Sequence, residues 1–85
     1  RPRRLQAGHV NPTLQKRSVN LHGHATSLAL EPEFWAVLDT AAKAGGFSMS
    51  GLIASIDDAR GERPLASACR VFALEQLQSL SSRTA

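Results

Sequence analysis

The feature that most constrains the fold is a switch in the alternation of apolar residues near the N-terminus. Val19 and Leu21 occupy odd-numbered positions, whereas Leu28 and Leu30 occupy even-numbered positions. Because successive side chains of a strand point to opposite faces, one continuous strand would turn part of this apolar set to water. The chain must therefore bulge or reverse direction near Gly23, where glycine permits the backbone conformation that either solution needs. The sequence leaves the choice between a short hairpin and a bulged strand open.

Three helices are predicted after this extended segment, over residues 32–45, 48–60 and 65–80. Pro32 suits the first helical position because its missing N–H has no partner there, and Gly46 provides a left-handed cap at the end of that helix. Ser48 is a good N-cap for the second helix, which ends before Gly61. With only about 12 residues the second helix is too short to be stable alone in water, so it must pack on other elements.

The chain has 85 residues, which is enough for one domain but gives a marginal hydrophobic core. Its single cysteine, Cys69, excludes a disulfide within the chain and fits a reducing, cytoplasmic compartment. No stretch approaches the roughly 20 apolar residues of a membrane span. Association of chains is the expected way to enlarge the core. The candidate core residues are Leu28, Leu30, Phe34, Trp35, Leu38, Leu52, Ile53, Ile56, Leu65, Cys69, Phe72 and Leu77.

Positive charge is concentrated in the first third of the chain. Residues 1–30 contain five basic and no acidic side chains, whereas residues 31–85 contain five basic and seven acidic ones, for a formal net charge of +3. Such asymmetry favours an anionic partner, with nucleic acid as the first candidate, and a solubilising tail is the alternative. We expect residues 1–15 to be a basic flexible arm, residues 16–80 to form one domain and residues 81–85 to be a frayed tail.

An ordered set of local features resembles the ribbon-helix-helix family of Arc, MetJ and CopG type repressors. The order is an alternating strand, a helix that begins at a proline, a glycine turn and a second helix. The residues that carry the resemblance are Thr26–Glu31 in the strand, Phe34, Trp35 and Leu38 in the first helix, Gly46–Ser50 in the turn, and Leu52 and Ile53 in the second helix. Over residues 16–77 the chain is similar to a bacterial subgroup with an N-terminal strand extension and an extra C-terminal helix.

The resemblance implies a mostly α-helical fold with a short β-ribbon, built as a homodimer. Two chains would pair their strands antiparallel into a two-stranded ribbon, and their helices would enclose one shared core. Burial of each large apolar side chain, at ~1.5–3 kcal/mol, is the driving force for this association. It stays open whether the third helix completes the dimer core or builds a tetramer.

In DNA-binding members of the family the ribbon enters the major groove, and its outward residues read base edges. The resemblance assigns Ala25, Ser27 and Ala29 to these positions. None of the three can make the bidentate contact that discriminates bases by ~1–3 kcal/mol. Better chemistry for base edges or phosphates lies in the strand extension, whose candidates are Lys16, Arg17, Asn20 and His22. The alternative is that residues 16–22 add a strand that covers an edge of the sheet.

The second contact that the resemblance implies is the start of the second helix, whose backbone N–H donors suit a phosphate. Here that site is Ser48, Met49 and Ser50, and the alternative is that Ser48 only caps the helix. The basic arm could follow the DNA backbone or enter a minor groove, or it could simply be solvated. Its candidate residues are Arg1, Arg3 and Arg4.

No metal, cofactor or catalytic site is predicted. His22 and His24 lie two positions apart, but two donors are too few for a closed zinc site, and no Cys or His pair has the spacing of zinc ligands. Asp57 and Asp58 are adjacent on a helix and are expected to point in different directions on a solvated face. The sequence has no phosphate-binding glycine loop and no nucleophile motif, so we do not expect an enzyme.

These observations predict a homodimeric protein that binds double-stranded DNA. The resemblance further implies a transcriptional regulator, associated with the nucleoid in a bacterial cytoplasm. The alternative is a dimerisation and protein-binding module, antitoxin-like or an adaptor, in which residues 64–80 dock onto another protein. This alternative is motivated by the apolar third helix and by the outward residues of the strand, two alanines and a serine, which offer little for reading bases.

Overall fold

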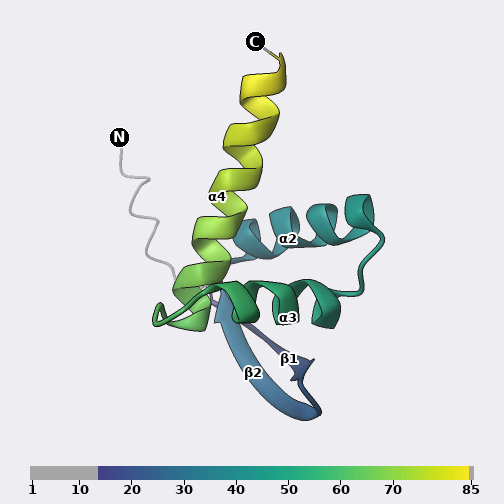
Figure 1. Cartoon of the computed structure of the whole chain (residues 1–85), viewed down its shortest axis with the longest axis vertical. Helices are drawn as coiled ribbons and strands as arrows, with labels where there is room; N and C mark the ends of the chain where they lie inside the picture. Colours follow the sequence, from purple (N-terminus) through teal and green to yellow (C-terminus); the bar gives the residue numbers. More distant parts are fainter. Residues whose placement is uncertain (1–13, 85) are drawn as a thin grey trace, which may run out of the picture.

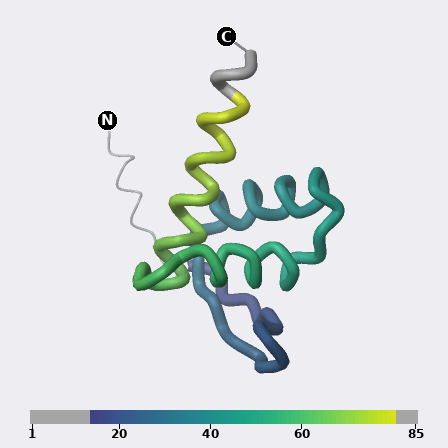
Figure 2. The backbone as a smooth tube through the Cα atoms, in the orientation of Figure 1, coloured from purple at the N-terminus to yellow at the C-terminus, as the bar shows by residue number. Residues whose placement is uncertain are grey.

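The computed structural model describes residues 14–84, which form two strands followed by three helices (Figure 1). The elements are β1 (Gln15–Leu21), β2 (His24–Leu30), α2 (Pro32–Gly45), α3 (Met49–Ala59) and α4 (Leu65–Thr84). The hairpin of β1 and β2 lies at one end of the molecule, α2 and α3 run side by side, and α4 crosses them and continues past them (Figures 1 and 2). Residues 1–13, most of the predicted arm, lie outside the described residues.

The switch in apolar alternation is a hairpin and not a bulge. β1 pairs antiparallel with β2, and the register runs from Leu21 opposite His24 to Gln15 opposite Leu30. The two turn residues, His22 and Gly23, have φ angles of 53° and 84°, the left-handed pair that a tight two-residue hairpin requires. In this register odd-numbered residues of β1 face the same side as even-numbered residues of β2, so both apolar sets meet on one face.

Both strands of the ribbon come from one chain, whereas the resemblance implied one strand from each of two chains. β1 is therefore the added strand that the sequence offered as an alternative, and it covers one edge of β2. In an antiparallel hairpin, hydrogen-bonded and non-hydrogen-bonded residue pairs alternate along the strands, and the pair next to this two-residue turn, Leu21 with His24, is hydrogen-bonded. The N–H groups of Ala25, Ser27 and Ala29, which belong to non-hydrogen-bonded pairs, therefore point away from β1. No hydrogen bond described within residues 14–84 joins this edge of β2 to another element. The edge is available to another strand.

The core lies where the inner face of the hairpin meets the three helices. Leu30, Leu38, Ile53 and Cys69 are fully buried, and Trp35 is 1% exposed. The other buried residues are Val19, Leu21, Leu28, Ala42, Leu52, Ile56, Ala68 and Ala73. The predicted core is thus confirmed for most positions, including the burial of the single cysteine. Phe34, Leu65 and Phe72 are only partly buried at its margin.

The third helix differs from its prediction in length and in one core residue. The α4 helix runs to Thr84, four residues past the expected end, and no glycine or proline interrupts this stretch. Leu77, predicted to face the core, is 50% exposed and lines an apolar groove that α4 forms with α2. Within the described residues no helix has both the length and the apolar character of a membrane span.

Candidate nucleic-acid interface

The face of the hairpin turned away from the helices is polar and carries no acidic side chain. The register places six residues there, at three cross-strand pairs: Lys16 with Ala29, Ser18 with Ser27, and Asn20 with Ala25. All are exposed except Ala29, which is partly buried. We call this set the outward face. The structure thus brings together five residues that the sequence analysis proposed as DNA contacts, and adds Ser18, which period-two alternation alone could have identified.

The start of α3 lies beside the outward face. The backbone N–H of Asn20 points away from β2 and donates a 3.0 Å hydrogen bond to Ser50 Oγ. This bond connects the free edge of β1 to the first turn of α3. The side-chain oxygen of Asn20 accepts a 3.1 Å bond from the N–H of Gly23 and so also holds the hairpin turn. The two surfaces that the resemblance implied for DNA are therefore adjacent.

The first turn of α3 retains free hydrogen-bond donors. Ser48 is the N-cap, and its Oγ accepts from the N–H of Gly51 at 3.0 Å, so the capping role is confirmed. Within the described residues the N–H groups of Met49 and Ser50 have no acceptor. Unpaired N–H groups at the positive end of a helix form a site for an anion such as a phosphate. The Met49 side chain packs partly against the core, and anchors this helix start.

Arg17 lies on the opposite face of the hairpin from the outward set. Its guanidinium pairs with both carboxylate oxygens of Asp39, at 3.1 and 3.3 Å, and lies 4.5 Å from the centre of the Trp35 ring. The Trp35 indole N–H in turn donates to the Gln15 carbonyl at 2.8 Å. Arg17 therefore fastens β1 to α2. Its position two residues before Val19 is the sequence signal for this inward placement.

His22 points toward the end of α3 and not toward the outward face. Its Nε2 atom lies 3.2 Å from Asp58 Oδ1 and 3.5 Å from Asp57 Oδ2. Asp57 also accepts a 2.6 Å bond from Arg60 Nε. The bond from Arg60, with a smaller contribution from His22, holds the pKa of the Asp57 carboxyl below its usual range. The expectation that Asp57 and Asp58 diverge is wrong, because the turn places His22 between the two carboxylates.

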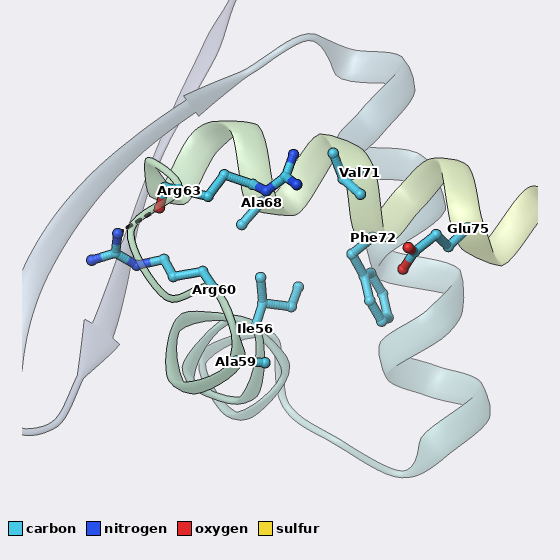
Figure 3. Close-up of a pocket in the computed structure, with 8 residues that line it drawn as sticks. All are labelled: Ile56, Ala59, Arg60, Arg63, Ala68, Val71, Phe72 and Glu75. Carbon is cyan, nitrogen blue, oxygen red and sulfur yellow. Dashed lines mark hydrogen bonds between the residues drawn. The ribbon is translucent and has the colours of Figure 1, made fainter.

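A depression between α3 and α4 lies outside this interface (Figure 3). It has a volume of about 250 Å³. Its lining residues are Ile56, Ala59, Arg60, Arg63, Ala68, Val71, Phe72 and Glu75. Arg60 Nη1 donates to the Arg63 carbonyl at 2.6 Å, so the Arg60 guanidinium binds both this carbonyl and the Asp57 carboxylate.

Of the remaining candidates, Arg1, Arg3 and Arg4 lie outside the described residues. A sequence model described as a ribbon-helix-helix domain matches residues 14–77. This match spans the hairpin, α2, α3 and more than half of α4. No curated protein and no solved structure matches the chain.

Proposed function

Because the chain belongs to the ribbon-helix-helix domain family, we propose that it is a dimeric DNA-binding protein that regulates transcription in a bacterial cytoplasm, in association with the nucleoid. Members of the family are generally DNA-binding regulators or antitoxins. The observation that carries the proposal is the hydrogen bond between Asn20 N and Ser50 Oγ. It joins a non-acidic strand surface and a helix start with free N–H donors into one surface that suits a polyanion.

The proposed dimer forms through the open edge of β2. Family members are usually dimers, and an exposed strand edge is a template for pairing with another chain. A second copy that pairs its own β2 antiparallel would produce a four-stranded sheet with the order β1-β2-β2-β1. All four strands would then present their outward faces on the same side. This arrangement keeps the paired strands of the family at the centre and adds one hairpin strand at each margin.

The width of such a sheet determines which residues approach bases. Adjacent strands lie about 4.8 Å apart, so the outer two strand axes of a four-stranded sheet are separated by about 14 Å. The major groove of B-DNA is about 12 Å wide. The two central β2 strands therefore enter the groove, and the β1 strands lie over its walls. Ala25, Ser27 and Ala29 approach base edges, whereas Lys16 and the start of α3 approach phosphates.

This division of contacts implies binding with modest sequence preference. Alanine offers only its methyl group to a thymine methyl, and serine can bond to any of several groups. Phosphate contacts from Lys16 and from the N–H groups of Met49 and Ser50 position the protein without specifying sequence. In this proposal Arg1, Arg3 and Arg4 add further sequence-independent affinity. Most of the binding free energy is then electrostatic and depends steeply on salt.

The test is fluorescence anisotropy of a labelled duplex, titrated with the protein at several salt concentrations between about 50 and 200 mM. Binding with 6–10 phosphate contacts should weaken by ~10³–10⁵ across this range. Lys16→Gln should reduce the steepness of log K plotted against log salt concentration, which we call the salt slope. The expected reduction is about two per dimer, since each chain loses one phosphate contact and each contact contributes about 0.9 to this slope. Lys43→Gln is the matched control, because Lys43 is the other lysine of the chain and is exposed in the last turn of α2, outside the outward face.

Two results would contradict the proposal. One is an absence of binding at low salt by protein that circular dichroism shows to be folded. The other is an equal effect of Lys16→Gln and Lys43→Gln on the salt slope. Arg17 is unsuitable for this experiment, because its substitution breaks an ion pair with Asp39 and a contact with Trp35 inside the chain.

The second candidate function is a protein-binding module that uses the C-terminal helix. An apolar groove of about 360 Å³ runs between α2 and α4. Its lining residues are Ala36, Val37, Thr40, Ala41, Ala44, Gln76, Leu77 and Leu80. Leu74 and Leu77 of α4 are half-exposed. If the protein is a folded dimer but does not bind DNA at low salt, this second function is favoured.

A further inference from the structure

Three potential metal ligands converge where the hairpin turn meets the end of α3. They are the imidazole of His22 and the carboxylates of Asp57 and Asp58, and one ligand atom of each lies within 4.8 Å of the others. His22 is separated from the two aspartates by 35 and 36 positions in the chain, so only the docking of the hairpin on α3 brings them together. His24, two positions after His22, does not belong to this cluster.

Two of the three separations in the cluster match those around a tetrahedral ion. Zinc bonds to histidine nitrogen and carboxylate oxygen at about 2.0–2.2 Å, so two ligand atoms of a tetrahedral zinc are separated by about 3.3–3.6 Å. His22 Nε2 lies 3.2 Å from Asp58 Oδ1 and 3.5 Å from Asp57 Oδ2. The third separation, between the two carboxylates, lies within 4.8 Å.

The charge around the cluster also favours a cation. Asp57 and Asp58 lie in the last turn of α3, where the carbonyl end of the helix already carries partial negative charge. This last turn contains no basic residue. Arg60 neutralises Asp57 through Oδ1, whereas among the side chains that the structure describes, those of residues 14–80, the only ion-pair partner of Asp58 is His22. One carboxylate charge is therefore left without a permanent cation beside it.

An ion can reach the cluster without opening the fold. The side chains of His22 and Asp58 are 56% and 68% exposed, and that of Asp57 is 19% exposed. The more buried Asp57 is held in place by Arg60, whose bond to Oδ1 leaves Oδ2 directed at His22. A ligand oriented in this way loses little conformational freedom when it binds an ion.

We propose that His22, Asp57 and Asp58 bind one divalent transition-metal ion such as zinc. His22 Nε2 and one oxygen from each aspartate are three ligands, and water completes the coordination. The nitrogen ligand favours zinc, nickel or cobalt over magnesium and calcium, which prefer oxygen-only sites. The ion links the hairpin turn to α3 and stabilises the folded chain, because the unfolded chain lacks this arrangement. The proposal does not depend on DNA binding.

The test uses the full chain, freed of metal, in a zinc titration followed by thermal unfolding and by calorimetry. We expect one zinc ion per chain and a Tm that rises with zinc concentration. His22→Asn should lower the affinity at least tenfold. Asparagine is the right substitute because it tolerates the positive φ of this position. Asp58→Asn, which preserves shape and removes the charge, should have a similar effect.

The matched controls are His24→Ala and His9→Ala, the other two histidines of the chain. His24 lies in the same hairpin, is exposed and is not part of the cluster. Both controls should bind zinc like the unaltered chain, and cobalt should show the intense visible absorption of four-coordinate geometry. A Kd above about 1 mM is too weak to count as a binding site. The proposal is therefore overturned if zinc at about 1 mM leaves the Tm unchanged. It is equally overturned if folded His22→Asn binds zinc as tightly as the unaltered chain, since the cluster is then only a set of ion pairs.

Discussion

Proline at Ser27 should separate formation of the hairpin from formation of the dimer. Ser27 lies opposite Ser18 in a pair whose N–H groups both point away from the other strand. Ser27→Pro therefore removes a donor from the open edge of β2 and leaves the hydrogen bonds to β1 intact. The preceding Thr26 is already extended, as a residue before proline prefers. The variant should fold with its hairpin but should dimerise poorly.

The size of the effect follows from the symmetry of the proposed dimer. Each chain loses one inter-chain hydrogen bond, so the dimer loses two, at about 0.5–1.5 kcal/mol each. A total of about 1–3 kcal/mol raises the dimer Kd by roughly fivefold to 150-fold. The proline ring adds a clash with the neighbouring strand, so the observed change should lie at or above the upper end. DNA affinity should fall in parallel, because a single hairpin has half of the proposed contacts.

Ser18→Pro is the matched control, because it makes the same change at the same cross-strand pair but on the outer edge of β1. Sedimentation equilibrium over a range of protein concentrations measures the Kd, and far-UV circular dichroism checks that both variants are folded. We expect Ser18→Pro to dimerise like the unaltered chain. Equal dimerisation of the two variants would refute pairing through β2, and a selective loss in Ser18→Pro would place the interface at β1.

Two further predictions concern stability. Arg17→Ala should lower the free energy of unfolding by about 1 kcal/mol, since it removes a partly exposed ion pair with Asp39 and a cation–π contact with Trp35. Urea denaturation measures this free energy. If Arg17→Ala unfolds at the same urea concentration as the unaltered chain, the two contacts are not formed in solution. Burial raises the pKa of the Cys69 thiol from its ordinary 9.0 to about 11. The unfolded chain then releases this proton at lower pH than the folded chain, so stability should fall between pH 9 and 11, by at most about 2–3 kcal/mol. In Cys69→Ala this part of the pH dependence should disappear, and an identical profile in both proteins would contradict the cause.

Local patterns in the sequence were sufficient for the elements and for most of the core. The switch in alternation at Gly23 required a reversal or a bulge, and Pro32, Gly46 and Ser48 marked helix ends that the structure confirms. These signals act over a few residues, through φ preference and through the capping of unpaired N–H and C=O groups. The same alternation determined which residues occupy the outward face, because period two leaves only two faces for a strand.

Other features depended on how distant segments pack, and no local pattern encoded them. The sequence could not show that Arg17 would reach Asp39 and Trp35, or that His22 would lie between Asp57 and Asp58, because these pairs are 18 to 36 positions apart and meet only through the docking angle of the hairpin. The exposure of Leu77 likewise depends on how closely α4 packs against α2, because a groove separates the two helices at this position. Periodicity determines which face of an element is apolar, whereas only the tertiary arrangement decides how far along the element that face is covered.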